Sequence, residues 1–246
     1  MHTSRYAVQL TDVTKRYGDG PNAVLALDQV GAGIESGTFT AVMGPSGSGK
    51  STFLHCAAGL DRPTAGEVRL GGQDLSGLRE RRLTELRRTR VGFVFQAFNL
   101  LPSLTVEQNI TLPLRLAGRR PEEAWLRHIV TVMDLGDRLT RHPAQLSGGQ
   151  QQRVAIARAL VTRPEVVFAD EPTGALDPET ARDILVLLRQ AVTDLHQTVV
   201  MVTHDPIAAA HTDQVLFLSG GRVVDGMVDP RADRVAEVMS GLRRAV

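Results

Sequence analysis

Short apolar runs alternate with longer mixed segments along this chain. Four runs are too short for helices and are typical of buried parallel strands: residues 38–43, 166–169, 198–202 and 215–218. Alternating apolar and polar positions over 7–13 and 24–34 predict two more strands, and 67–73 predicts another that ends in a turn. Gly220-Gly221 predicts a hairpin turn into residues 222–224. Parallel strands that alternate with helices predict an α/β fold.

One long stretch, from about residue 97 to 146, has a helical composition. Four prolines are expected to divide it into segments: Pro102, Pro113, Pro121 and Pro143. We predict that this stretch is a helical subdomain inserted into the α/β core. Just before it, residues 79–90 carry six arginines and two glutamates. A solvated helix face explains that charge run better than contact with anionic headgroups does.

The last segment, residues 232–245, has the pattern of an amphipathic helix. Val235, Val238, Met239 and Leu242 stand at i, i+3, i+4 and i+7, so they form one apolar stripe. The stripe either packs on the core of the same chain or docks on a partner. Because an exposed apolar stripe is costly in a soluble protein, packing on the same chain is the favoured interpretation.

Composition limits the classes of protein that this chain can represent. Its 246 residues fit one large domain with a subdomain, and a formal net charge of +1 gives no broad field for nucleic acid. Cys56 is the only cysteine, which suits a reducing compartment, and we expect it to be a small buried hydrophobe. No apolar run approaches the roughly 18 residues of a membrane helix, and the first ten residues lack a signal-peptide core. Any membrane-spanning part is therefore expected on another chain.

A glycine-rich sequence between a predicted strand and a predicted helix fits the phosphate-loop pattern. It comprises Gly44, Pro45, Ser46, Gly47, Ser48, Gly49, Lys50 and Ser51. Glycines allow backbone N–H groups to converge on phosphates, and the helix N-terminus adds partial positive charge. Lys50 is expected to reach the β- and γ-phosphates, and Ser51 to bind Mg²⁺.

Two acidic residues end the apolar run at 166–169. Asp170 and Glu171 are then expected at the carboxyl edge of the sheet, beside the phosphate loop. Acidic pairs at strand ends are common surface features, but the upstream loop and the sequence 172–177 favour a catalytic role. Asp170 would hold Mg²⁺ through water, and Glu171 would polarise the attacking water.

A third motif, Ser147-Gly148-Gly149-Gln150, precedes a long helical segment over 151–160. Ser147 is a good helix N-cap, so a capped helix start is the simplest interpretation. That interpretation does not explain the two glycines. Exposed N–H groups and a hydroxyl at a helix N-terminus also form a site for an anion.

These three motifs, in this order, resemble the ATP-hydrolysing subunit of an ATP-binding-cassette (ABC) transporter. The resemblance extends from about Tyr6 to about Val228. It implies an α/β fold with a RecA-like P-loop core, an N-terminal antiparallel β region and an inserted helical subdomain. A single domain over 1–246 is expected to divide as follows: nucleotide-binding core 1–96 and 155–230, helical signature subdomain 97–154, and C-terminal helix 231–246.

The resemblance also implies roles that the residues alone do not establish. In this family the stretch matching Ser147, Gly149 and Gln150 binds the γ-phosphate held by the opposite subunit, which implies a homodimer that closes over ATP. Gln96 would link the state of the nucleotide to the transmembrane partner. His204 would contact the γ-phosphate, although a lone histidine is usually structural.

Tyr17 would stack on adenine, although by sequence alone it could be a core or surface aromatic. The expected catalytic residues are Glu171, His204, Lys50 and Gln96. The expected metal-binding residues are Ser51, Gln96 and Asp170. The expected nucleotide-binding residues are Tyr17, Gly44, Pro45, Ser46, Gly47, Ser48, Gly49, Lys50, Ser51, Thr52, Ser147, Gly148, Gly149 and Gln150.

A finer resemblance comes from residues 87–105, which are similar to the branch that serves macrolide efflux, lipoprotein release and the division-associated FtsE proteins (MacB/LolD/FtsE-like). The chain is thus expected to hydrolyse ATP with Mg²⁺ and to drive a separate permease from the cytoplasmic face of the membrane, for export or mechanotransmission. The alternative is an FtsE-like regulatory ATPase that signals to a cell-wall enzyme.

Two other classes of ATPase fit the sequence less well. A DNA-repair or translation ATPase is disfavoured by the single cassette, the near-zero charge and the lack of long coiled-coil heptads. A small-molecule kinase would share the phosphate loop but would not need residues 147–150.

Overall fold

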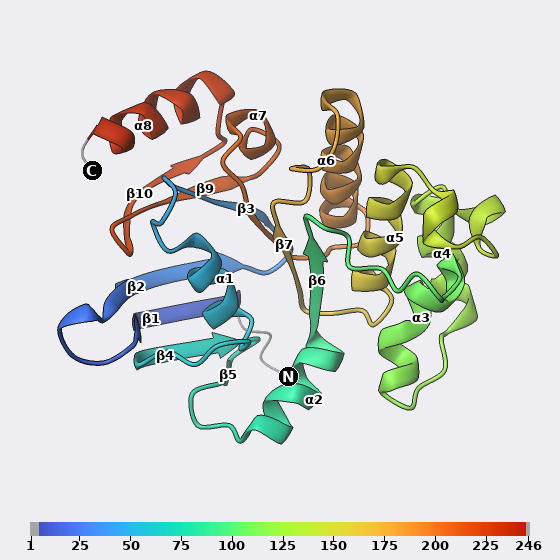
Figure 1. Ribbon diagram of the computed structural model, residues 1–246, viewed down its shortest axis with the longest axis horizontal. Coiled ribbons are helices and arrows are strands. Elements are labelled where there is room, and N and C mark those ends of the chain that lie inside the picture. The colour runs from blue at the N-terminus through green and yellow to red at the C-terminus, as the bar shows by residue number, and fades with distance from the viewer. Residues whose placement is uncertain (1–4, 245–246) are drawn as a thin grey trace.

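Two sheets organise the chain in the computed structural model, which describes residues 5–244. The smaller sheet is antiparallel, in the order β2-β1-β4-β5, and lies at the lower left of Figure 1. Its strands are β1 (Tyr6–Tyr17), β2 (Val24–Glu35), β4 (Ala65–Leu70) and β5 (Gln73–Asp74). The antiparallel N-terminal β region is therefore confirmed.

The larger sheet has six strands in the order β10-β9-β3-β8-β7-β6. Its strands are β3 (Phe39–Met43), β6 (Val91–Phe95), β7 (Val166–Asp170), β8 (Val199–Val202), β9 (Gln214–Ser219) and β10 (Arg222–Val228). The strands from β9 to β6 are parallel, and β10 pairs antiparallel to β9 after the predicted hairpin turn. The sequence prediction of buried parallel strands is confirmed.

Apolar cores cover both faces of the larger sheet. Along β7, Val166 and Phe168 face one core, and Val167 and Ala169 face the other. Such alternation follows from the two-residue period of a strand. The first core contains α1 (Lys50–Ala57) and the smaller sheet, and the second contains the helices on the right of Figure 1. Burial on both faces explains why this strand is apolar throughout.

The predicted helical stretch holds α3 (Val106–Leu116), α4 (Glu123–Val132) and the start of α5 (Gly148–Leu160). Short 3-10 turns η2 (Gly136–Arg138) and η3 (Pro143–Gln145) join α4 to α5. The expectation that Pro113 divides two helical segments is wrong, because Pro113 lies inside α3. The buried stripe of Val106, Ile110 and Leu114 holds that helix together across the missing N–H.

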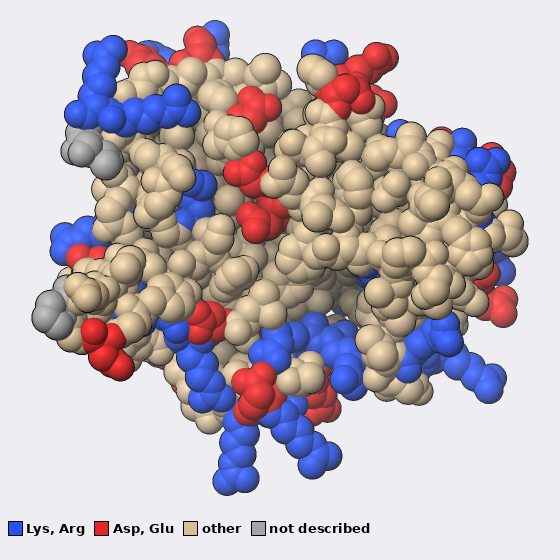
Figure 2. Space-filling model, viewed as in Figure 1, with Lys and Arg blue, Asp and Glu red and all other residues tan. Residues whose placement is uncertain are grey.

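The boundary expected between residues 154 and 155 falls inside α5, which runs unbroken from Gly148 to Leu160. The limits of the helical subdomain therefore stay a prediction. The arginine-rich segment forms α2 (Glu80–Arg90), which buries only Leu83 and Leu86. Figure 2 shows Lys and Arg side chains gathered at the bottom of the view, in the region of α2. The arginines of α2 therefore lie on a mainly solvated helix face, which is the interpretation that the sequence favoured.

Three further helices flank the larger sheet: α6 (Pro178–Thr193), α7 (Pro206–Ala209) and α8 (Ala232–Arg244). Val235 and Met239 of α8 are buried in a cluster that includes Met43 and Phe217, and Val238 and Leu242 are partly buried against it. The apolar stripe of the tail thus packs on the same chain, as the sequence analysis favoured. A short 3-10 turn, η1 (Gly20–Asn22), joins β1 to β2.

Candidate functional site

The glycine-rich loop leaves the carboxyl end of β3 and opens α1, which is the context that the phosphate-loop pattern requires. Its glycines are enforced by space and by backbone geometry. A Cβ atom at Gly44 would collide with the carbonyl oxygen of Leu218. Gly49, which caps α1, has φ +102° and lies against the carbonyl oxygen of Ala26. Side chains are thus excluded where the backbone must turn into the helix.

Lys50 lies folded over the loop that precedes it. Its Nζ donates hydrogen bonds to the carbonyl oxygens of Gly44 at 2.9 Å and Pro45 at 2.8 Å. Burial lowers the pKa of the Lys50 ammonium, and the nearby Glu171 and Asp170 partly offset this lowering. The lysine therefore lies within the field of both acidic residues, inside the loop that the sequence predicts to hold phosphate.

A cavity of about 460 Å³ opens over this loop. Its walls come from the loop and the start of α1, from the carboxyl ends of β6, β7 and β8, and from the start of β2. They comprise Val24, Leu25, Ala26, Ser46, Gly47, Ser48, Gly49, Lys50, Ser51, Thr52, Gln96, Asp170, Glu171 and Val202. Most of the residues predicted for phosphate and metal binding are thus brought into one cavity, because parallel strands end at the same edge of the sheet.

A second cavity, of about 500 Å³, is lined by the same loop. It is lined by Gly44, Pro45, Ser46, Lys50, Glu171, His204 and Arg243. Glu171 and His204 come from the ends of neighbouring strands, and His204 Nδ1 lies 2.7 Å from Glu171 Oε2. The two cavities share Ser46, Lys50 and Glu171, so the loop, the carboxylate and the histidine form one continuous site.

The two acidic residues have different surroundings. Asp170 is partly buried, and burial raises the pKa of its carboxyl group, an effect that the neighbouring His55 and Lys50 side chains oppose. Glu171 has a left-handed backbone with φ +46°, and its N–H donates to the carbonyl oxygen of Val202 at 2.9 Å. That turn directs Glu171 away from the strand, toward His204.

Ser147 caps α5 as the sequence predicts, and the helix begins at Gly148. The Ser147 hydroxyl accepts a hydrogen bond from Gln150 N at 3.3 Å, and the Gln150 side-chain oxygen accepts one from Ser147 N at 3.1 Å. Gly149 has a packing reason that sequence reasoning missed, because a Cβ there would collide with the side chain of Thr180 at the start of α6. None of residues 147–150 lines either cavity beside the phosphate loop.

Tyr17 is not among the residues that line these two cavities. Its hydroxyl donates to Asp61 at 2.7 Å, and the Lys15 ammonium lies 4.8 Å from its ring centroid. Burial raises the pKa of the Tyr17 phenol, and the hydrogen bond to Asp61 adds to that effect. Stacking on adenine stays a prediction. The apolar wall that the cavity does have, Val24 and Leu25, was missed, although both are exposed apolar residues at a strand start.

Gln96 is followed by an unusual turn that a distant arginine holds in place. Phe98 and Asn99 both have left-handed backbones, with φ of +58° and +51°. Arg158, near the end of α5, donates to the carbonyl oxygens of Asn99 at 2.5 Å and Phe98 at 2.8 Å. Burial lowers the pKa of the Arg158 guanidinium. No sequence signal distinguished this arginine from the others in so arginine-rich a chain.

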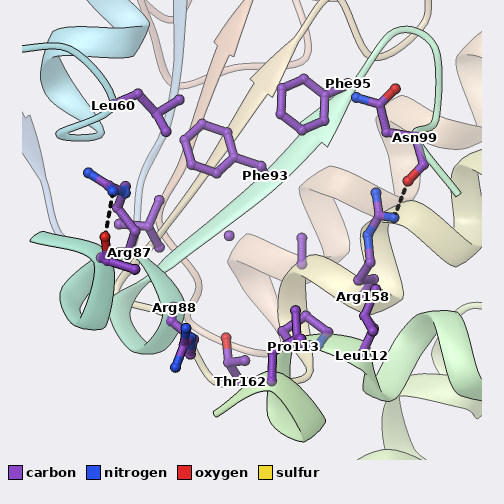
Figure 3. A pocket seen from close by; sticks show the side chains of 15 residues that line it. Leu60, Arg87, Arg88, Phe93, Phe95, Asn99, Leu112, Pro113, Arg158 and Thr162 are labelled. Atoms are coloured by element: carbon purple, nitrogen blue, oxygen red, sulfur yellow. Dashed lines mark hydrogen bonds between the residues drawn. The ribbon is translucent and has the colours of Figure 1, made fainter. Parts of the chain in front are cut away.

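Arg158 also lines a groove of about 440 Å³ between α2, β6 and the helical region, which Figure 3 shows from close by. Phe93 and Phe95 project into it from β6, and Leu112 and Pro113 bound it from α3. Its basic residues are Arg87, Arg88 and Arg158, and its lining contains no acidic residue. The groove is thus mainly apolar, with a positive rim.

No metal-binding cluster of three or more His, Cys, Asp or Glu side chains exists within residues 5–244. Ser51, Gln96 and Asp170 nevertheless line one cavity, and their hydroxyl, amide and carboxylate oxygens suit a hard cation. Mg²⁺ is usually held by one or two carboxylates together with substrate phosphates. The donor set therefore fits a magnesium ion that enters together with a nucleotide.

Comparison with known proteins identifies the class that this fold and site define. A family model described as "ABC transporter" matches residues 27–174, which is more than half of the chain. The chain belongs to the ABC transporter family, as one of its ATPase cassettes. No helix within residues 5–244 has the length and apolar character to cross a membrane.

Two curated relatives resemble the chain closely. It is 44% identical over 223 residues to the macrolide export ATP-binding/permease protein MacB of Marinobacter nauticus. The matched region covers 90% of this chain and 34% of that protein. The chain is 41% identical over 245 residues to the methionine import ATP-binding protein MetN of Rhizobium etli. The matched region covers 96% of this chain and 66% of that protein. The chain spans about a third of the length of the MacB relatives.

Solved structures agree with this assignment. A dimeric structure of the ATP-binding cassette MJ0796, in a post-hydrolysis state bound to ADP and Pi, matches with a TM-score of 0.81 and 41% identity, over 91% of this chain and 99% of that one. The cbiO1 protein of Clostridium perfringens, part of the cbiONQ transporter complex, matches with a TM-score of 0.83 and 27% identity, over 98% and 94% of the two chains. The α/β P-loop fold is therefore confirmed.

Proposed function

We propose that this chain binds ATP in the two joined cavities and hydrolyses it to drive a membrane permease. The observation that carries this proposal is the meeting of Lys50, Asp170, Glu171 and His204 beside one phosphate loop. Phosphoryl transfer to water needs positioned cations and a group that orients the water, rather than a covalent intermediate. The site holds groups of both kinds.

Each residue has a proposed part in that reaction. The backbone of residues 44–49 and the start of α1 hold the phosphates, and Lys50 leaves its two carbonyl partners to contact the β- and γ-phosphates. Glu171 accepts a proton from the attacking water, and His204, which already contacts Glu171, orients that carboxylate and touches the γ-phosphate.

Ser51, Gln96 and Asp170 would hold Mg²⁺ together with phosphate oxygens. The ion would neutralise charge that develops on the phosphates during transfer. Gln96 lies at the end of β6 and begins the turn that Arg158 holds, so movement of this turn would reach the cavity through Gln96.

A second copy of the chain is the proposed partner that completes each site. Support comes from Ser147 and Gly149, which lie at a helix N-terminus that attracts anions but line neither cavity of their own chain. In a head-to-tail dimer they would meet the γ-phosphate held by the other copy. The dimer would open when that phosphate leaves, because the phosphate bridges the two copies.

A permease on another chain is the proposed membrane partner, and this ATPase would lie against it at the inner face of the cell membrane. The groove of Figure 3 suits such a contact, because it is apolar, has a positive rim and begins next to Gln96. We propose no nucleic-acid partner. Since the relatives described above are transport proteins, transport is favoured over an FtsE-like regulatory role.

The decisive test measures phosphate release by the purified chain at several protein concentrations, with and without Mg²⁺. We expect ATP hydrolysis that requires Mg²⁺, and activity per molecule that rises with protein concentration because two copies form each site. Activity per molecule that is independent of concentration, in a protein that stays monomeric with ATP, would refute the shared site. Absence of hydrolysis and of ATP binding would refute the proposal as a whole.

A further inference from the structure

The C-terminal helix reaches the phosphate loop at one point. Met239 of α8 packs in the same buried cluster as Met43, and Met43 is the residue immediately before Gly44 of the loop. The cluster therefore fixes the position of α8 against the strand that delivers the loop. The residue one helical turn after Met239 is therefore expected to lie close to the loop itself.

That position holds an arginine. In a helix, residues four apart lie on the same face, so Arg243 continues the face that carries Val235 and Met239. Arg243 lines the cavity of Gly44, Pro45, Ser46, Lys50, Glu171 and His204. The apolar stripe of α8 thus ends in a cation where the helix passes from the core to the site.

The guanidinium of Arg243 is available to a ligand, because no described residue pairs with it. Within residues 5–244, no ion pair or side-chain hydrogen bond of Arg243 is formed, whereas Arg231 and Arg234 of the same segment pair with Asp233 and Glu237. Among the described residues that line the cavity, Glu171 supplies the one carboxylate, and it is in contact with His204. An anion that entered this cavity would find two cations, Lys50 and Arg243, and no unpartnered acid among the lining residues that the structure describes.

We infer that Arg243 is a nucleotide-binding residue that contacts the terminal phosphate of ATP, or the phosphate released from it, across the cavity from Lys50. A guanidinium offers several N–H donors in a plane that matches phosphate oxygens. This inference rests on the proposed ATP site. It assigns to α8, beyond its packing role, a part in recognising the triphosphate.

The chain supplies a matched control. Arg244 is the next residue, carries the same charge in the same last helical turn, and does not line the cavity. Both side chains are exposed, so Arg243→Ala and Arg244→Ala should leave the thermal unfolding midpoint close to that of the parent. Any difference between the two variants in nucleotide binding then reflects position and not net charge.

The experiment measures the dissociation constants of ATP and ADP by fluorescence titration, and kcat and KM for ATP, for Arg243→Ala, Arg243→Lys, Arg244→Ala and Lys50→Ala. We expect Arg243→Ala to weaken ATP binding by about 10- to 150-fold, as for one charge-assisted hydrogen bond, and to weaken ADP binding much less. Arg243→Lys should recover part of the loss. Arg244→Ala should behave like the parent.

The outcomes separate this inference from the proposed function. If Lys50→Ala loses ATP binding while Arg243→Ala and Arg244→Ala bind ATP equally well, the role of Arg243 is refuted and the ATP site stands. If Arg243→Ala weakens ATP and ADP equally, contact with the terminal phosphate is refuted. If Lys50→Ala binds ATP normally, the ATP site itself fails, and the role of Arg243 fails with it.

Discussion

The phosphate-loop edge and the start of α5 both offer helix N-termini suited to anions, but they differ in what surrounds them. At the phosphate loop, cations and carboxylates from several strand ends converge on joined cavities. At α5, Ser147 and Gln150 cap the helix reciprocally, and no cavity beside the phosphate loop includes them. The first region is equipped to hold a nucleotide within one chain. The second offers first-turn N–H groups that the helix itself cannot use, and so it suits a ligand brought by another chain.

The largest expected effect comes from Lys50→Ala, which removes the cation of the self-contained region. We expect kcat/KM for ATP to fall by about 10²–10³-fold, because a preorganised charge on the transferring phosphate is lost. Phosphate release assays measure the effect, and the thermal unfolding midpoint is the control for folding. Normal turnover by a folded Lys50→Ala would remove the phosphate-loop assignment.

Glu171→Gln tests whether hydrolysis and closure can be separated. The substitution keeps the size of the side chain and one acceptor oxygen but removes the proton acceptor, so kcat should fall by about 10²-fold while ATP still binds. A closed dimer should then persist with ATP and Mg²⁺, and size-exclusion chromatography would detect it. If this variant binds ATP yet remains monomeric at saturating ATP, closure needs a membrane partner or does not occur.

Ser147→Arg addresses the other region. The long cation would fill the space meant for a neighbour's phosphate, so it should block dimer formation while ATP binding to the single chain stays within about 2-fold of the parent, since the site in cis is intact. Size-exclusion chromatography with ATP and Mg²⁺ measures the dimer fraction of the Glu171→Gln protein with and without Ser147→Arg. Equal dimerisation with and without Ser147→Arg would count against a role in trans.

The smallest expected effect compares two capping boxes. Thr105 and Gln108 cap α3 as Ser147 and Gln150 cap α5. Thr105→Ala and Ser147→Ala should each lower the free energy of unfolding by about 1 kcal/mol, as measured by urea denaturation. Only Ser147→Ala should also weaken the ATP-dependent dimer. A dimer weakened equally by both variants would mean that the Ser147 hydroxyl acts only as a cap.

Motifs could be predicted from the sequence where function demands particular residue types in a fixed local order. The loop at 44–51, the acidic pair at 170–171 and the cap at Ser147 lie where the strand and helix pattern indicated. Contacts between residues far apart in the chain carried no such signal. Arg158 holds a turn some sixty residues earlier in the chain, and Gly149 is required by Thr180 on another helix.

The sequence by itself determined the alternation of buried strands and helices, because side-chain periodicity is local. It also determined the phosphate loop, because the order of its glycines, lysine and serine is a pattern of consecutive residues. Tertiary structure alone decided that His204 contacts Glu171, that α3 continues through Pro113, and that α8 brings Arg243 to the phosphate loop. Each of these depends on how separate elements pack. Packing is set by the shape of the whole core, which no local pattern of residues contains.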